Sequence, residues 1–207
     1  ISYLFIMADA NVKLSPQELD LVQNREWLII KRSVMDKAAV LLARVRDKID
    51  AHQTFFDVVA SYELPPVMPK ISKGDNYRGF PYVVLDHPRV FESLDVFSVR
   101  CLFWRGHHFM ISFHLEGKHR DSFLSHFYSK KTEGKVDWYV CVHDNPWQHY
   151  FERDNFLPLR EKTVAEWGIV FSEMRFVRMA AKTDISGWNE VGSWFENRLD
   201  ELADWLD

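Results

Sequence analysis

Two neighbouring segments, residues 95–103 and 107–115, carry an apolar side chain at every second position, and this alternation constrains the fold more than any other feature. Successive residues of a β-strand face opposite sides, so each segment is predicted to be a strand with one buried face. Gly106 lies between the segments and suits the left-handed backbone of a short turn. The sequence therefore predicts an antiparallel β-hairpin. Its predicted core face comprises Phe97, Val99, Cys101, Phe103, Phe109, Ile111, Phe113 and Leu115.

The length of the turn decides the register of this hairpin. A two-residue turn would place apolar residues opposite polar ones, whereas a three-residue loop from Trp104 to Gly106 aligns Cys101 with Phe109, so we expect the longer loop. The other face is then either a functional site or a solvated side of the sheet. Its expected pairs are Val96 with His114, Ser98 with Ser112, Arg100 with Met110, and Leu102 with His108.

A long amphipathic helix is predicted near the N-terminus. Ser15 and Glu18 form a capping box around Pro16, so a helix begins at Pro16. From Asn24 to Ile49 apolar residues recur at three- and four-residue spacing, which is typical of a helix that packs on a sheet.

The rest of the chain alternates between turn, strand and helix signals. Residues 144–172 are the exception, because their prolines and aromatics follow no regular spacing and most of their secondary structure cannot be assigned. A capping box at Thr163 and Glu166 indicates a short helix within that stretch. The other predicted elements are a loop at Lys70–Arg78, strands at 80–86, 136–143 and 174–182, and helices at 118–131 and from Ser186 onward.

These elements predict an α+β fold with a mainly antiparallel sheet of four to six strands. The long N-terminal and C-terminal helices are expected to pack on one face of that sheet. No linker of distinctive composition divides the 207 residues, which favours a single domain over residues 1–207. Residues 1–14 are expected to be a poorly ordered leader or an addition to a natural start at Met7, although the apolar run before Met7 also resembles the tail of a secretory signal.

Composition excludes several classes of protein. The net charge of −4 and the scattered basic residues argue against nucleic-acid binding. No segment has the roughly 18 consecutive apolar residues of a membrane span. Cys101 and Cys141 lie in apolar, strand-like runs and are expected to be reduced and buried, which indicates the cytoplasm.

The loop at Lys70–Arg78 is a candidate anion site. Lys73, Asn76, Tyr77 and Arg78 bring donors between two glycines, and glycine-flanked backbone amides beside cations bind phosphate or carboxylate groups. Turn chemistry in a solvated loop explains the same residues without any ligand.

Five of the nine histidines fall between His107 and His126, but their spacing does not indicate a metal site. His108 and His114 share a strand face and lie about 20 Å apart, too far to bind one ion. No nucleophile elbow and no phosphate-binding glycine loop occurs, so we expect no metal and no cofactor.

The run KISKGDNYRGFPYVVLDHPR, with the start LSPQELDLVQNREW and the hairpin sequence, resembles an uncharacterised family of bacterial proteins. The resemblance covers about the first two thirds of the chain. It implies a bacterial cytoplasmic setting and no particular activity.

We therefore expect a non-catalytic binding protein for a small anionic ligand or a protein partner. The alternative is an acid-base enzyme in which His108 or His114 carries a proton and Arg100 acts as an anion clamp near Asp86. The oligomeric state is left open by the sequence.

Overall fold

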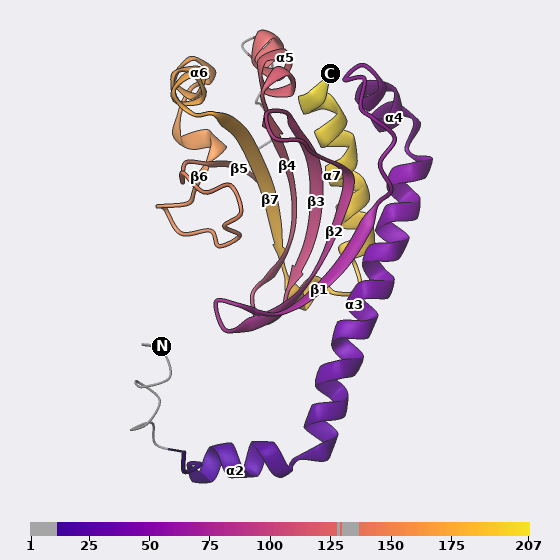
Figure 1. The fold of residues 1–207 in the computed structure, drawn as a ribbon, viewed down its shortest axis with the longest axis vertical. Coiled ribbons are helices and arrows are strands. Elements are labelled where there is room, and N and C mark those ends of the chain that lie inside the picture. Colours follow the sequence, from indigo (N-terminus) through magenta and orange to yellow (C-terminus); the bar gives the residue numbers. More distant parts are fainter. Residues whose placement is uncertain (1–11, 128, 130–136) are drawn as a thin grey trace. The chain divides into compact units, whose positions relative to one another are not determined.

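The computed structural model describes residues 12–127, 129 and 137–207 (Figure 1). It divides into two units, residues 1–37 and 38–207, and each is described by itself. The expectation of one domain stays a prediction. The expected leader lies mostly outside the described residues.

The first unit contains helix α2 (Pro16–Gln23) and the beginning of helix α3 (Arg25–Ala51). The capping box is confirmed, because the Ser15 hydroxyl accepts from the Glu18 amide at 3.3 Å and the Glu18 carboxylate accepts from the Ser15 amide at 2.7 Å. The long helix predicted from Asn24 is also confirmed. Its buried side chains begin at Ala38, in the second unit.

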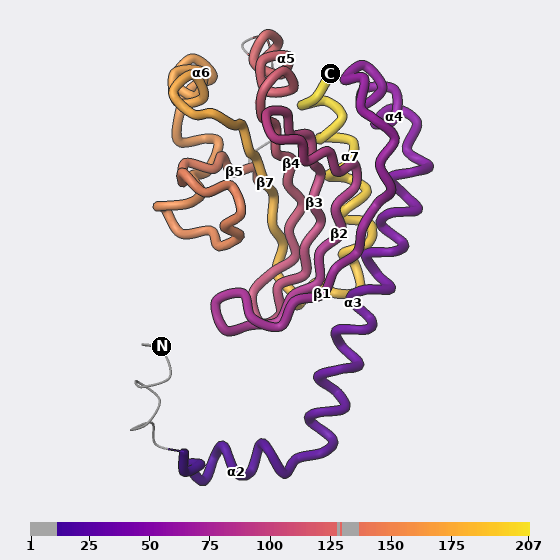
Figure 2. Tube along the Cα trace, in the orientation of Figure 1, coloured from indigo at the N-terminus to yellow at the C-terminus, as the bar shows by residue number. Residues whose placement is uncertain are grey.

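The second unit is built on a seven-stranded sheet in which every neighbouring pair is antiparallel (Figure 1, Figure 2). The order along the sheet is β1-β2-β3-β4-β7-β5-β6. The α+β class is confirmed, and the sheet has seven strands instead of the predicted four to six, because β1 and β6 were not predicted. The strands are β1 (Lys70–Tyr77), β2 (Phe80–Phe91), β3 (Val96–Trp104), β4 (His108–Glu116), β5 (Trp138–Cys141), β6 (Phe156–Pro158) and β7 (Phe176–Asp184).

Helices cover one face of this sheet, hereafter the helix face. Helix α4 (Gln53–Ala60), helix α7 (Val191–Leu206) and the last part of α3 lie on this side (Figure 1). The ring of Phe195 in α7 is 6.4 Å from that of Phe109, and Tyr62, just after α4, is 4.8 Å from Phe97. Lys48 of α3 forms an ion pair with Glu196 of α7. Packing of the N-terminal and C-terminal helices on one face is therefore confirmed.

The remaining helices follow the predicted signals with shorter bounds. Helix α5 is Lys118–Phe127, and the rest of the predicted helix to residue 131 lies mostly outside the described residues. Helix α6 (Val164–Glu173) begins at the predicted Thr163 capping box. The described residues also contain the single-turn 3₁₀ helices Leu159–Glu161 and Ile185–Gly187. Among the described residues, no helix combines the length and apolar character needed to cross a membrane.

The predicted register of the β3–β4 hairpin is wrong by two residues. Trp104 pairs with His108 and Cys101 pairs with Ile111, so the three-residue loop runs from Arg105 to His107. Gly106 has the expected left-handed backbone, with φ of +80°. The loop begins one residue later than predicted because Trp104 is the last residue of its strand. Its side chain packs in the sheet and is 3% exposed. A shift of two residues leaves every side chain on its predicted face.

The predicted loop at residues 70–78 is also wrong, because residues 70–77 form strand β1, paired with β2. The turn is confined to Arg78 and Gly79, which have φ of +52° and +87°. Gly74 is required in the strand, since a Cβ there would lie 2.3 Å from the ring of Tyr82. Glycine, aspartate and asparagine favour turns, but here they lie within a strand.

The buried positions of the helix face allow a stability test. Phe113 is fully buried between β4 and α5, whereas Phe56 in α4 is 60% exposed. We expect Phe113→Ala to lower the free energy of unfolding by about 4 kcal/mol, because it leaves a cavity in the core. Phe56→Ala should lower it by less than about 1 kcal/mol. Urea denaturation checks both, and equal losses would contradict the assigned core.

Candidate functional site

The face of the sheet opposite the helices, hereafter the second face, is buried and not solvated. His114 is 4% exposed, Ser112 is 1% exposed and Met110 is fully buried. The segment of residues 142–155, between β5 and β6, lies over this face (Figure 1). Tyr150 from that segment packs in one apolar cluster with Leu102 and Met110. The alternative of a face in contact with water is therefore wrong.

The guanidinium of Arg178, on β7, holds the covering segment to the sheet. Its Nη1 donates to the carbonyl oxygens of Pro146 and Gln148, each at 2.5 Å, and its Nη2 lies 3.0 Å from Nδ1 of His149. No carboxylate of the described residues lies within ion-pairing distance of Arg178. Burial lowers its pKa to about 10, so the guanidinium is charged at neutral pH. The backbone carbonyls of the covering segment thus compensate a buried cation.

His149 lies between two arginines. Besides its contact with Arg178, its Nε2 is 3.4 Å from Nη1 of Arg100. Burial and the two guanidinium charges hold the pKa of His149 well below its usual range. The ring is therefore neutral, and its Nδ1 accepts a hydrogen bond from Arg178. Sequence reasoning missed His149 because it lies in the irregular residues 144–172, where no periodicity assigns a side chain to a face.

Arg100 and Asp86, two of the weak catalytic candidates, form a bidentate ion pair across β2 and β3. Arg100 Nε is 2.7 Å from Asp86 Oδ1 and its Nη2 is 2.9 Å from Oδ2. The guanidinium also lies 4.9 Å from the ring centre of Trp147. Both carboxylate oxygens of Asp86 are occupied by this pair.

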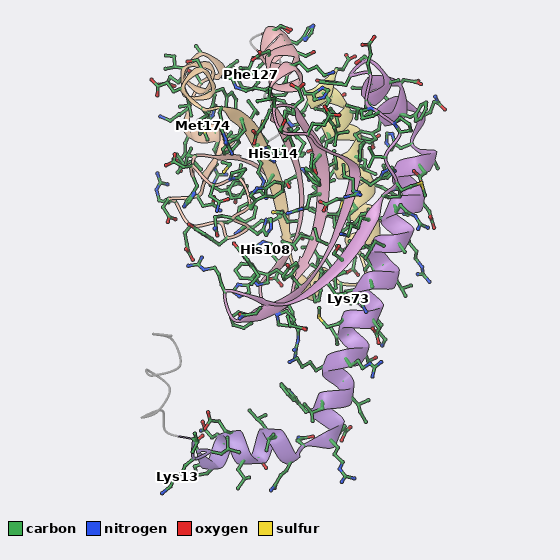
Figure 3. All side chains as sticks on the ribbon, in the orientation of Figure 1. Lys13, Lys73, His108, His114, Phe127 and Met174 are labelled. Atoms are coloured by element: carbon green, nitrogen blue, oxygen red, sulfur yellow. The ribbon has the colours of Figure 1, made fainter. Side chains whose placement is uncertain are left out.

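The two candidate histidines lie at opposite ends of β4 (Figure 3). His114 Nε2 is 2.9 Å from a Glu116 carboxylate oxygen, and burial, with Arg178 and Arg100 nearby, lowers the pKa of His114 to about 3. Burial, with Lys182 and His107 nearby, lowers the pKa of His108 to about 4. Both rings are neutral at physiological pH.

A pocket of about 510 Å³ opens at the His108 end of the second face. One wall is the ring of His107, stacked on Trp104 with 3.5 Å between ring centres. Three ring nitrogens in this region, Trp104 Nε1, His107 Nε2 and His108 Nε2, are buried without a hydrogen-bond partner in the described chain. The pocket is lined by Arg78, Phe80, Trp104, Gly106, His107, His108, Tyr150, Phe151, Glu152 and Lys182.

Two cations reach this pocket. Lys182 Nζ lies 4.8 Å from the ring centre of Phe151, and burial lowers the pKa of its ammonium group. No carboxylate among the described residues lies within ion-pairing distance of Lys182. Arg78 lies 4.2 Å from the ring centre of Tyr150 and forms a 3.3 Å ion pair with Glu152. Lys182 is therefore an exposed cation that lies over aromatic rings and has no ion-pair partner among these residues.

The four predicted ligand-binding residues do not converge. Lys73 is exposed on β1 and lies away from His108 (Figure 3). Asn76 closes the turn by accepting from the Gly79 amide at 3.0 Å. The Tyr77 hydroxyl donates to Gln148 Oε1 at 3.1 Å and accepts from the His149 amide at 2.7 Å. Of the four, Arg78 alone lines the described pocket. Whether any of them binds a ligand stays a prediction.

Histidines, cysteines and carboxylates do not gather into a metal-binding group anywhere in the residues that the structure describes. Lys182, Tyr150, Phe151 and Glu152 were not predicted as site residues. Lys182 is the last residue of the strand predicted at 174–182, but its place beside His108 depends on the β4–β7 pairing.

No protein-family model matches the chain, and no curated protein and no solved structure matches it. The resemblance to an uncharacterised bacterial family therefore stays a prediction.

Removal of the Arg178 charge tests how the second face is covered. We expect Arg178→Met to lower the free energy of unfolding by about 3 kcal/mol, because two buried carbonyls lose their donor. Hydrogen exchange at residues 142–155 should become faster. Arg175→Met is the matched control, since the Arg175 side chain is 73% exposed. Equal effects of the two variants on stability and exchange would contradict the role of Arg178.

His108 makes stability depend on pH. The pKa of His108 is about 4 in the folded chain, because the ring is buried, and 6.5 in the unfolded chain. Between these two values only the unfolded chain is protonated at His108. Stability from this group is therefore complete above pH 6.5 and is lost as the pH falls from 6.5 to about 4. We expect the wild type to lose about 2 kcal/mol more than His108→Gln between about pH 7 and about pH 5. Parallel pH profiles in urea denaturation would show that His108 does not titrate in this way.

Proposed function

We propose that this protein binds a small anionic molecule in the pocket beside His108. The observation that carries the proposal is Lys182, a cation at the pocket with no carboxylate partner among the described residues. Lys182 is exposed, but the Phe151 ring covers one side of its ammonium group, which keeps part of the surrounding water away and strengthens its attraction for an anion. The pocket volume of about 510 Å³ falls within the usual range of small-molecule sites.

The pocket walls favour a ligand that combines an anionic group with an apolar or planar body. Phe80, Phe151 and the Trp104–His107 stack provide aromatic surface, and Arg78 provides a second cation. Arg78 already forms an exposed ion pair with Glu152, and such pairs are weak enough for a ligand anion to compete. His107 and His108 contribute ring nitrogens and no positive charge, because burial lowers the pKa of both.

The geometry favours a binding protein over an acid-base enzyme. The enzyme hypothesis requires Arg100, a candidate histidine and Asp86 to line the same pocket. The described pocket includes His108 but neither Arg100 nor Asp86, which occupy each other in a bidentate pair. We therefore keep binding as the proposed function.

We also propose a cytoplasmic setting. Cys101 and Cys141 are both buried and unpaired, and burial raises the pKa of each thiol. Buried free thiols are typical of proteins in a reducing compartment.

A thermal-shift screen of carboxylate and phosphorylated metabolites, followed by calorimetry on any hit, tests the binding proposal. We expect Lys182→Gln to weaken binding of the hit by about 10-fold or more, because the site loses its unpaired cation. Lys162→Gln is the matched control, since Lys162 also lies over an aromatic ring, 5.9 Å from the centre of Trp167, away from the pocket. An anion whose affinity is unchanged by Lys182→Gln would contradict the assigned site.

A second comparison separates this pocket from the site predicted at residues 70–78. Arg78→Gln should weaken the same hit, because Arg78 lines the pocket. Lys73→Gln should leave its affinity unchanged, because Lys73 is exposed on strand β1 and does not line the pocket. The opposite result would favour the site predicted from the sequence.

A further inference from the structure

Helix α2 and the beginning of α3, in the first unit, carry exposed apolar side chains. Every residue from Val12 to Ile30 is exposed, and helix α2 contains no buried residue. Short helices in water need an apolar face packed against a partner, since their own hydrogen bonds barely stabilise them. Contiguous exposed apolar residues of this kind mark interaction surfaces. The exposed apolar set is Leu19, Leu21, Val22, Trp27, Leu28, Ile29 and Ile30.

Four of the six residue pairs between Asp20 and Lys31 are complementary when the sequence is read in the opposite direction. Counted outward from the bond between Arg25 and Glu26, acidic Asp20 and basic Lys31 occupy equivalent positions. Arg25 and Glu26 are themselves equivalent and opposite in charge. Apolar residues match in the same way: Leu21 is equivalent to Ile30, and Val22 to Ile29.

This pattern is the one that pairing with a second copy of the chain requires. In a two-fold symmetric dimer each contact occurs twice, so one segment must carry both members of every pair. Neither Asp20 nor Lys31 forms an ion pair with another described residue of the first unit. Lys31 lies 5.7 Å from the ring centre of Trp27 in its own helix, which leaves its charge available to an acidic partner.

We propose that residues 19–32 pair with the same segment of a second copy in antiparallel orientation, around a two-fold axis between Arg25 and Glu26. Leu21 and Val22 then pack on Ile30 and Ile29 of the second copy, and Asp20 lies beside its Lys31. The proposal rests on the first unit alone and is independent of ligand binding in the pocket.

Sedimentation velocity on the full chain, from low to high micromolar concentration, tests the dimer. We expect the wild type to dimerise with increasing concentration and Ile29→Glu to stay a monomer. Ile29 is 69% exposed, so this substitution should leave the thermal melting of the monomer unchanged. A wild type that is monomeric over the whole range overturns the proposal. So does an Ile29→Glu variant that melts like the wild type and still dimerises.

A charge exchange tests the antiparallel register. Asp20→Lys and Lys31→Asp should each weaken the dimer by about 10-fold, because each replaces two attractions with two repulsions. The double variant Asp20→Lys/Lys31→Asp should restore the wild-type dissociation constant. Asp144→Lys makes the same charge change at an exposed position outside the segment and should have no effect. Single variants without effect, or a double variant weaker than both singles, overturn the antiparallel pairing.

Discussion

The second unit depends on one buried cation. Arg178 is 2% exposed, and its compensation comes from carbonyl oxygens of the covering segment, not from a carboxylate. A buried guanidinium without hydrogen-bond acceptors would cost several kcal/mol, so the sheet and the covering segment stabilise each other through this contact. Without the covering segment, water would hydrate the Arg178 guanidinium. Burial of the second face is therefore what makes the carbonyl acceptors of the covering segment necessary.

Covering the second face also determines the charge of its histidines. His149, His114 and His108 are buried near arginine or lysine, and both influences disfavour the protonated ring. The face therefore contributes hydrogen-bond acceptors and ring surface at neutral pH. The positive charge near the pocket is concentrated on Lys182 and Arg78, at the rim of the aromatic cluster. This separation of neutral interior and cationic rim supports the proposal of an anionic ligand with an apolar body.

Several elements could be predicted from the sequence because they depend on short-range rules. Both capping boxes, the long helix α3 and the side of the sheet on which each hairpin residue lies follow from spacing and local hydrogen bonding. Strand β1 could not be predicted, because its glycine, aspartate and asparagine have low strand propensity and only the pairing with β2 stabilises them. The pocket residues of the covering segment could not be assigned either, because irregular backbone has no repeating pattern that places a side chain on one face.

The sequence by itself determined which residues alternate and where helices begin, since these properties arise within a few residues along the chain. It indicated that Arg100 and His108 share a face, and a register error of two residues did not change that. Tertiary structure alone decided that this face is covered, that Asp86 pairs with Arg100, and that Lys182 lies beside His108. These contacts join residues far apart in the chain, and their free energy depends on burial, which no local pattern specifies.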